Sequence, residues 1–231
     1  MRQTEMSENL DNQNPLIEVQ DLQHYYATKL VLDVKSWKLL KNEHQLLLGP
    51  SGSGKTTLLG ILTGLLSPSK GSINALGRSI TDEPISKLSS FRARNIGFVF
   101  QDHHLVSSLT INENLILARH LADLPIDQEW ADQLLNHLGL SDHKNAKPDQ
   151  LSHGEAQRSA IARAAVTKPP LILADEPTSA LDDDNAIKVV ELLKSLSEEA
   201  GSTMIIASHD SRLKPFFSNS IILEKLQEAS S

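Results

Sequence analysis

The sequence predicts an α/β fold, in which a parallel sheet covered by helices carries an N-terminal antiparallel β-subdomain and an inserted all-helical subdomain. Short apolar runs, such as residues 171–175 and 203–208, alternate with helical patterns, which is typical of buried parallel strands. Residues 16–20 and much of 31–40 instead alternate apolar and polar side chains, which favours antiparallel strands with one buried face. From about residue 102 to 166 the spacing of apolar residues is helical, which indicates the insert.

The remaining elements are predicted from local signals along the chain. A buried strand at 45–48 leads into a glycine-rich loop and a helix that begins at Thr57 and ends near Ser67. Two capping boxes, each a Thr or Ser with a Glu three residues later, predict helices that begin after Thr110 and Ser152. Further strands are expected at 71–77, 96–100 and 220–223, and further helices at 127–139 and 185–200.

Length and composition limit the classes of protein that the chain can represent. The 231 residues suit one domain, expected over residues 15–228, after a polar, flexible N-terminus at 1–14 that lacks the features of a signal peptide. A net charge of −7 without any basic block argues against a nucleic-acid-binding surface. The chain has no cysteine, which excludes disulfides and thiolate metal sites, and no apolar run long enough to cross a membrane.

The loop after the strand at 45–48 reads Gly-Pro-Ser-Gly-Ser-Gly-Lys-Thr, which matches the phosphate-binding P-loop and predicts a P-loop NTPase core. Glycines let backbone amides approach a phosphate, and the following helix presents the positive end of its dipole. The Lys55 side chain can reach the β- and γ-phosphates, and the Thr56 hydroxyl can bind Mg²⁺. The predicted nucleotide-binding residues of this segment are Gly49, Pro50, Ser51, Gly52, Ser53, Gly54, Lys55, Thr56 and Thr57.

Two carboxylates follow the buried strand at 171–175, because Asp175 is its last residue and Glu176 is the next. Ligands bind at the carboxyl ends of strands in open parallel sheets, so we expect both side chains beside the P-loop. Asp175 is expected to hold Mg²⁺ together with Thr56, and Glu176 to orient or deprotonate an attacking water. The alternative is a pair of solvated acids, which the four apolar residues before them disfavour.

Six motifs in one order resemble those of ABC transporter ATPase subunits. After the P-loop come Gln101 at a strand end, Leu-Ser-His-Gly-Glu at 151–155, the strand with Asp175 and Glu176, Ser-Ala-Leu-Asp at 179–182, and His209. The resemblance covers nearly the whole chain, from about Leu16 to Leu226. Residues 95–101 and 109–114 are most similar to the branch that serves lipoprotein release, macrolide export, peptide-antibiotic resistance and cell division.

The resemblance implies an ATPase that works as a head-to-tail homodimer with two ATP molecules held between the subunits. Each site would take its P-loop from one chain and residues 151–155, the signature of the family, from the other. The Ser152 hydroxyl and the Gly154 amide can point at a γ-phosphate from across such an interface. An isolated subunit could not complete this site, so hydrolysis would follow closure of the dimer.

Several residues outside the P-loop receive their roles only through the resemblance. Gln101 would contact Mg²⁺ and the attacking water and would sense the membrane partner, and His209 would hold the γ-phosphate. Asp182 is similar to the aspartate of the family's D-loop, the segment that follows the catalytic carboxylate in the chain. Tyr26 resembles the aromatic residue that stacks on adenine, with Tyr25 as the alternative.

The chain departs from the family in its signature, which usually reads Leu-Ser-Gly-Gly-Gln but here carries His153 and Glu155. Glu155 still completes a capping box, but it places a carboxylate near an incoming triphosphate, and His153 adds bulk where the backbone approaches phosphate. We expect reduced but not abolished ATPase activity, which restoring Gly and Gln would raise. A second departure, Asn42 in place of the usual Gly before Glu43, is expected to alter only a turn.

The resemblance also implies a cytoplasmic subunit, peripheral on the cytoplasmic face of the inner or plasma membrane, that powers transport through separate integral membrane permease subunits. Residues 102–109 are where the family docks that partner. Two other interpretations stay open: a mechanical ABC ATPase of the cell-division type, and a DNA-associated ABC ATPase, which no coiled coil or basic stripe supports. The adjacent pair His103–His104 lacks further ligands, so no metal besides Mg²⁺ is expected.

Overall fold

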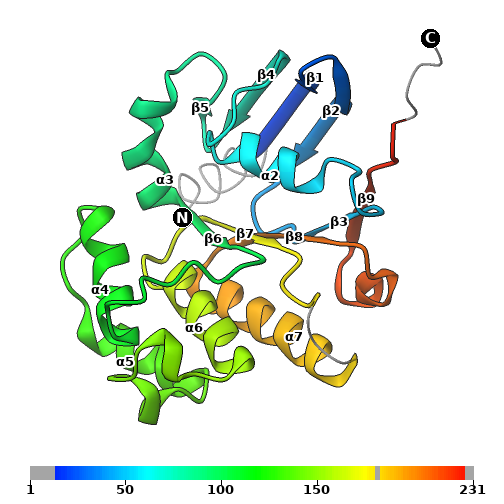
Figure 1. Cartoon of the computed structure of the whole chain (residues 1–231). Helices are drawn as coiled ribbons and strands as arrows, with labels where there is room; N and C mark the ends of the chain where they lie inside the picture. The colour runs from blue at the N-terminus through cyan, green and yellow to red at the C-terminus, as the bar shows by residue number, and fades with distance from the viewer. Residues whose placement is uncertain (1–13, 180–182, 227–231) are drawn as a thin grey trace, which may run out of the picture.

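A five-stranded parallel sheet forms the centre of the molecule (Figure 1). The computed structural model describes residues 14–179 and 183–226 of the chain. Within the sheet the strand order is β6-β7-β8-β3-β9, and every pairing is parallel, which confirms the prediction from the apolar runs. The strands are β3 (Gln45–Leu48), β6 (Ile96–Val99), β7 (Leu171–Asp175), β8 (Thr203–Ser208) and β9 (Asn219–Ile222).

A second, four-stranded sheet is antiparallel and has the order β2-β1-β4-β5. Its central strand β1 places Ile17 opposite Leu39 on one side and opposite Ala75 on the other, and all three side chains are fully buried. The predicted antiparallel subdomain with one buried face is therefore confirmed. The strands are β1 (Ile17–Tyr26), β2 (Lys29–Leu39), β4 (Lys70–Ala75) and β5 (Arg78–Ser79).

The parallel strands are apolar at nearly every position because a hydrophobic core lies on each face of their sheet. In β8, Met204 and Ile206 belong to the core formed with α6 (His153–Ala165) and α7 (Asp183–Ala200). Ile205, the residue between them, belongs to the core shared with α2 (Lys55–Leu62) and the antiparallel sheet. Helix α2 thus lies between the two sheets, and its first turn is fixed at the edge where the parallel strands end (Figure 1).

The helical subdomain packs on the other side of the parallel sheet (Figure 1). Both predicted capping boxes are confirmed: the Thr110 amide donates to Glu113 over 2.8 Å, and the Ser152 amide donates to Glu155 over 2.8 Å. In the part of the chain that the structure describes, no helix is long and apolar enough to cross a membrane. The helical elements here are α4 (Ile111–Leu121), α5 (Gln128–His137), α6, and the short 3₁₀ turns η2 (Ser141–His143) and η3 (Pro148–Gln150).

Some predicted element boundaries are wrong. Helix α2 begins at Lys55 instead of Thr57 and ends at Leu62 instead of near Ser67. It ends early because Gly64 takes a φ of 66°, and Leu88 lies so close that a Cβ at Gly64 would come within 2.5 Å of it. Leu88 belongs to a helical stretch without a sequence prediction. This stretch consists of η1 (Ile85–Leu88) and α3 (Ser89–Asn95).

The start of the predicted helical insert is not helical. Residues 102–109 form an irregular segment that is organised by Asn114, a fully buried residue of α4. The Asn114 amide accepts a hydrogen bond from the Val106 amide over 2.8 Å and donates to the carbonyl oxygens of Val106, Leu109 and Thr110. These side-chain bonds satisfy backbone groups that a helix would otherwise pair, so the segment is fixed without regular structure.

Asn42, the second departure from the family pattern, lies in a turn before β3. Its φ of 66° is in the left-handed region, which Asn tolerates better than most residues other than Gly. The Asn42 amide donates to the Thr203 hydroxyl over 2.8 Å, which ties the turn to the start of β8. Asn42 therefore lies in a turn, as expected, and the effect of this departure stays a prediction.

Candidate nucleotide site

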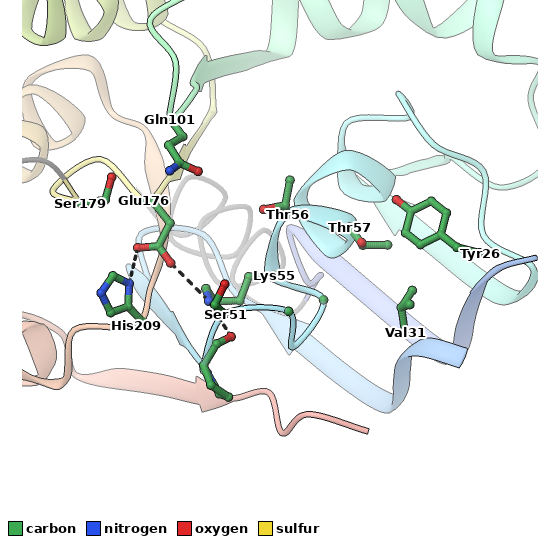
Figure 2. A pocket seen from close by; sticks show the side chains of 13 residues that line it. Tyr26, Val31, Ser51, Lys55, Thr56, Thr57, Gln101, Glu176, Ser179 and His209 are labelled. Atoms are coloured by element: carbon green, nitrogen blue, oxygen red, sulfur yellow. Dashed lines mark hydrogen bonds and ion pairs between the residues drawn. The ribbon is translucent and has the colours of Figure 1, made fainter. Parts of the chain in front are cut away.

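A cavity of about 680 Å³ opens where β3, β7 and β8 end (Figure 2). Ligands bind at this edge of open parallel sheets because loops and helix N-termini converge there. Tyr26 and Val31 lie at one end of the cavity, and Glu176 and His209 lie at the other (Figure 2). The full lining is Tyr26, Val31, Pro50, Ser51, Gly52, Gly54, Lys55, Thr56, Thr57, Gln101, Glu176, Ser179 and His209.

The P-loop wraps around the amino group of Lys55. The Lys55 Nζ atom donates to the carbonyl oxygens of Gly49 over 2.7 Å and Pro50 over 3.1 Å, and the side chain is only 5% exposed. Gly54, the N-cap of α2, takes a φ of 93°, which glycine adopts without strain. Among the described residues no side chain caps α2, so its first amides lack a side-chain acceptor there and can bind an anion.

Glu176 connects Lys55 and His209 across the site. Its Oε1 atom lies 3.2 Å from Nζ of Lys55, and its Oε2 atom lies 2.9 Å from Nδ1 of His209 (Figure 2). The expected placement beside the P-loop is confirmed, although β8 separates β7 from the P-loop strand β3. Glu176 has a φ of 48°, an uncommon conformation that turns its carboxylate away from the end of β7 into the cavity.

Asp175 lies just below the cavity and does not line it. Its side chain is buried, with an exposed fraction of 5%, and its Oδ1 atom has no hydrogen-bond partner among the described residues. Burial raises the pKa of the Asp175 carboxyl above its ordinary value, and a hydrogen bond from the Thr56 hydroxyl offsets part of this effect. A buried carboxylate oxygen without a partner is costly, so this atom is available for a cation.

The two candidate adenine-stacking residues differ clearly in position. Tyr26 is 51% exposed and lines the cavity, where its ring also makes an edge contact with His24 at 4.8 Å. Tyr25 is half-buried and directs its hydroxyl to Gln23, 3.4 Å away. Of the two tyrosines, only Tyr26 therefore presents a ring face to a ligand in this cavity.

The comparisons with known proteins agree with this geometry. Residues 32–179 match the family model described as ABC transporter. The lipoprotein-releasing system ATP-binding protein LolD 2 of Rhodospirillum rubrum is 39% identical over 203 residues, which is 85% of this chain and 88% of that protein. The putative hemin import ATP-binding protein HrtA of Staphylococcus haemolyticus is 42% identical over 185 residues, which is 79% of this chain and 83% of that protein.

Solved structures give the same result. The dimeric structure of MJ0796, a bacterial ABC transporter cassette, superposes with a TM-score of 0.82 and 34% identity, over 90% of this chain and 94% of that one. Its post-hydrolysis state bound to ADP and Pi superposes equally well, with a TM-score of 0.82 and 33% identity, over 92% and 97% of the two chains. The chain belongs to the ABC transporter family. It is an ATP-binding subunit of this family and hydrolyses ATP.

The signature of this ABC transporter subunit lies outside its own nucleotide cavity, because neither Ser152 nor Gly154 belongs to the lining. The Glu155 carboxylate is bound back onto the helix cap, where it accepts hydrogen bonds from the Ser152 hydroxyl over 2.7 Å and the Ser152 amide over 2.8 Å. These bonds lower the pKa of Glu155, and His143 lies 3.4 Å from its other oxygen. The carboxylate is therefore held within the capping box in its ionised form, and the expected repulsion of ATP by Glu155 stays a prediction.

Residues 101–106, the Q-loop segment, begin at the cavity and continue away from it. Gln101 lines the nucleotide cavity, as the sequence predicts. The rings of His103 and His104 separate: His103 lies against His153, with centroids 4.8 Å apart, and His104 makes an edge contact with Phe100 at 5.0 Å. The adjacent histidines therefore do not form a common metal site.

A second cavity, of about 320 Å³, lies between the Q-loop segment and the helical subdomain. Its lining is mostly apolar, and two of its residues are unusually exposed for their type: Leu121 at 64% and Val106 at 40%. We call this cavity the apolar groove. It is lined by Ala93, Ile96, Gly97, Phe98, Phe100, His104, Val106, Asn114, Leu117, Ala118, Leu121, Arg163, Ala164 and Thr167.

Two predicted nucleotide-binding residues, Gly49 and Ser53, do not line the cavity, and the side chain of Ser53 is buried. Asp182 lies outside the described residues. Val31 and Ser179 line the cavity but were not predicted as site residues. The sequence carries a signal for Ser179, because it begins the stretch that leads to Asp182, but none for Val31, whose place depends on β2 passing beside the start of α2.

Proposed function

We propose that this chain is the Mg²⁺-dependent ATP-hydrolysing motor of an ABC-type membrane complex, and that it acts as a head-to-tail homodimer on the cytoplasmic face of the membrane. The observation that carries the proposal is the position of Glu176, 3.2 Å from Lys55 and 2.9 Å from His209. Glu176 orients and deprotonates the attacking water, and Lys55 and His209 stabilise the charge on the γ-phosphate. Phosphoryl transfer needs mainly this kind of positioning and electrostatic stabilisation.

The two ends of the cavity suit the two ends of ATP. At one end Tyr26 offers an aromatic face, with the apolar side chain of Val31 beside it (Figure 2), and both favour a base. At the other end the uncapped amides of α2 and the Lys55 amino group favour phosphates. Lys55 would exchange its contact with Glu176 for a phosphate oxygen, which frees the carboxylate for the water.

We infer that Mg²⁺ is held by Thr56, Asp175 and Gln101. The donor set consists of a hydroxyl, a carboxylate and an amide, and hard oxygen ligands of this kind suit Mg²⁺. The buried Asp175 Oδ1 atom without a partner supports this assignment. When bound, the ion neutralises charge on the β- and γ-phosphates. Its positive charge would reverse the effect of burial on Asp175 and favour the ionised carboxylate.

Replacing Asp175 by asparagine is expected to raise the Mg²⁺ concentration that half-saturates ATPase activity by roughly 10- to 100-fold. The substitution keeps the size of the side chain but removes the charge that attracts the ion. A Mg²⁺ titration at saturating ATP measures the effect, and Asp149→Asn, in η3 and outside the cavity lining, is the matched control. An unchanged Mg²⁺ requirement would remove Asp175 from the metal site.

The dimer is proposed because the site is incomplete in one chain. Ser152 and Gly154 lie outside the cavity that Lys55 and Glu176 line, which supports a sandwich in which they serve a nucleotide held by a second subunit. The solved structure of MJ0796 is dimeric, which supports the same assembly here. Light scattering of the purified chain tests the proposal: ATP doubles the mass if the sandwich forms and leaves it at one chain if it does not.

The apolar groove is the proposed docking site for the membrane permease. Its exposed Leu121 and Val106 would be covered by an apolar helix of the partner. The groove is also lined by Phe100 and His104, so a partner bound there contacts the Q-loop segment that begins at Gln101. Movement of the permease and occupancy of the ATP site would thus affect the same stretch of chain.

Replacing Leu121 by aspartate is expected to weaken permease binding by about 10-fold or more without changing the ATPase activity of the free subunit. The charge would be desolvated when the partner covers the groove. Ile126→Asp is a matched control, because Ile126 is also 64% exposed in the helical subdomain but does not line the groove. Pull-down by solubilised permease subunits measures binding, and equal loss for both variants would contradict this site.

A further inference from the structure

The signature contains one side chain whose position the ATP site does not explain. His153 is the first residue of α6 and lies between Ser152 and Gly154, the two groups proposed to contact the partner subunit's ATP. Its imidazole lies against that of His103, with ring centroids 4.8 Å apart and planes inclined by 53°. Both rings line a small cavity of about 380 Å³ between the Q-loop segment and the start of α6. The His153 ring is therefore turned toward its own chain.

His103 is a firm support for this ring because its backbone is fixed from two sides. The Arg163 guanidinium, nearly three turns further along α6, donates to the carbonyl oxygen of His103 over 3.0 Å and to that of His104. Asn114 fixes the end of the Q-loop segment through its bonds to Val106. The His103 ring is half-buried, so it has little freedom to follow a movement of His153.

Without His103, the His153 side chain could adopt other rotamers. The backbone of His153 is helical, so its side chain can choose between staggered rotamers, and the ring is exposed enough to change between them. Side chains on a helix tilt toward its N-terminus, and His153 is the first residue of α6, so a rotated ring would come nearer to the first amides of this helix. Those amides, with the Ser152 hydroxyl, are the groups that the γ-phosphate must reach, so a free ring would obstruct them.

We propose that His103 is a positioning residue that holds the His153 imidazole away from the phosphate-binding start of α6. This inference rests on the proposed ATP sandwich and adds to it a residue that does not line the nucleotide cavity. It also revises the expectation drawn from the altered signature. The bulk of His153 costs little while His103 holds the ring, so His153→Gly alone changes dimer formation little.

The test is a double-substitution cycle in a Glu176→Gln background, in which hydrolysis does not deplete the ATP-bound dimer. The ATP concentration at half-dimerisation is measured by light scattering for the parent, His103→Ala, His153→Gly and the double variant. We expect His103→Ala to raise this concentration roughly 2- to 10-fold, the range of one aromatic ring pair. The double variant should match His153→Gly alone, and His103→Phe, which keeps a ring at this position, should restore the parent value.

The interaction between the two substitutions separates positioning from a structural role of His103. A structural role would weaken dimerisation by the same factor whether residue 153 is His or Gly, and this result would overturn the inference. An unimpaired His103→Ala variant would also overturn it. ATP binding to the monomer and thermal unfolding confirm that each variant is folded. A parent that binds ATP but never dimerises would instead overturn the sandwich on which the inference rests.

Discussion

Replacing Glu176 by glutamine should stop ATP hydrolysis while ATP continues to bind, so that the closed dimer accumulates. Glutamine fills the same space but cannot take a proton from water, and general-base catalysis contributes about 100- to 10,000-fold. Lys55 keeps its two carbonyl acceptors at 2.7 and 3.1 Å, so the P-loop should stay intact when the contact to Glu176 is lost. ATP turnover is measured in the presence of Mg²⁺. The mass of the protein is measured by light scattering, once without nucleotide and once with ATP in the absence of Mg²⁺.

Two further variants make this result specific to the site. Glu191→Gln changes an exposed carboxylate on α7 and should leave both turnover and mass unchanged. His209→Ala removes the group that holds Glu176 from the other side, at 2.9 Å, and should also slow hydrolysis. Turnover near the parent level in Glu176→Gln would show that another group activates the water. A variant that binds ATP but stays monomeric would show that closure needs more than this chain and its nucleotide.

The sequence predicts most of the core because the same local signals decide structure and function. The P-loop needs glycine at position 54, where φ is 93°, a strand before the loop and a helix after it. The sequence indicates each of these three features locally. The capping boxes at Thr110 and Ser152 are equally local, and both are confirmed. Apolar runs reveal the parallel strands because a core lies on each face of the sheet.

The wrong predictions share a physical cause, which is a specific side-chain contact that no local pattern of residues indicates. Helix α2 ends at Leu62 because Leu88, 24 positions after Gly64, packs where a longer helix would need space. Residues 102–109 are not helical because the side chain of Asn114 bonds their backbone. Neither interaction has a periodicity or a motif, so a reading of local pattern cannot find it.

The nucleotide site also combines features that the sequence predicts with contacts that it does not predict. Residue type and position predict the P-loop, Asp175 and Glu176, and the family resemblance predicts Gln101; the structure brings all of them to one edge of the sheet. The contact of Glu176 with His209 depends on β7 and β8 being neighbours, which the sequence does not specify. The contact of His103 with His153 depends on the path of the Q-loop segment across α6, which no local pattern specifies.

Replacing Gly154 by alanine should abolish ATP-driven dimerisation without weakening the fold. Gly154 lies in the first turn of α6, and a Cβ there would meet only Arg158 Nη1, at an ordinary 3.5 Å. Its φ is not in the left-handed region, so its own chain gives no reason for glycine at this position. Because alanine is the better helix former, the free energy of unfolding should stay equal or rise by up to about 1 kcal/mol.

The reason for glycine at this position must then lie outside the isolated chain. In the proposed sandwich the Gly154 amide approaches the γ-phosphate of the ATP bound by the partner, and a methyl group would occupy that space. ATP should still bind the monomer, because Gly154 does not line the nucleotide cavity, whereas ATPase activity should fall by about 100-fold or more. Thermal unfolding, nucleotide binding and turnover of the same preparation measure the three effects separately.

Gly97→Ala provides the opposite case, because a Cβ at Gly97 would collide with the carbonyl oxygen of Ala164 in α6. That substitution should lower the free energy of unfolding by about 1–3 kcal/mol, as overpacking does. A loss of stability in Gly154→Ala similar to that in Gly97→Ala would make Gly154 structural and remove this support for the sandwich.

Mixing Gly154→Ala with Lys55→Ala tests whether the two residues act across the interface. In a head-to-tail dimer of the two variants, both defects fall in one nucleotide site, and the other site combines an intact P-loop with an intact signature. The mixture should therefore be more active than either inactive variant alone. If Lys55 and Gly154 instead acted on the same ATP within one chain, every chain in the mixture would be defective and mixing would restore nothing.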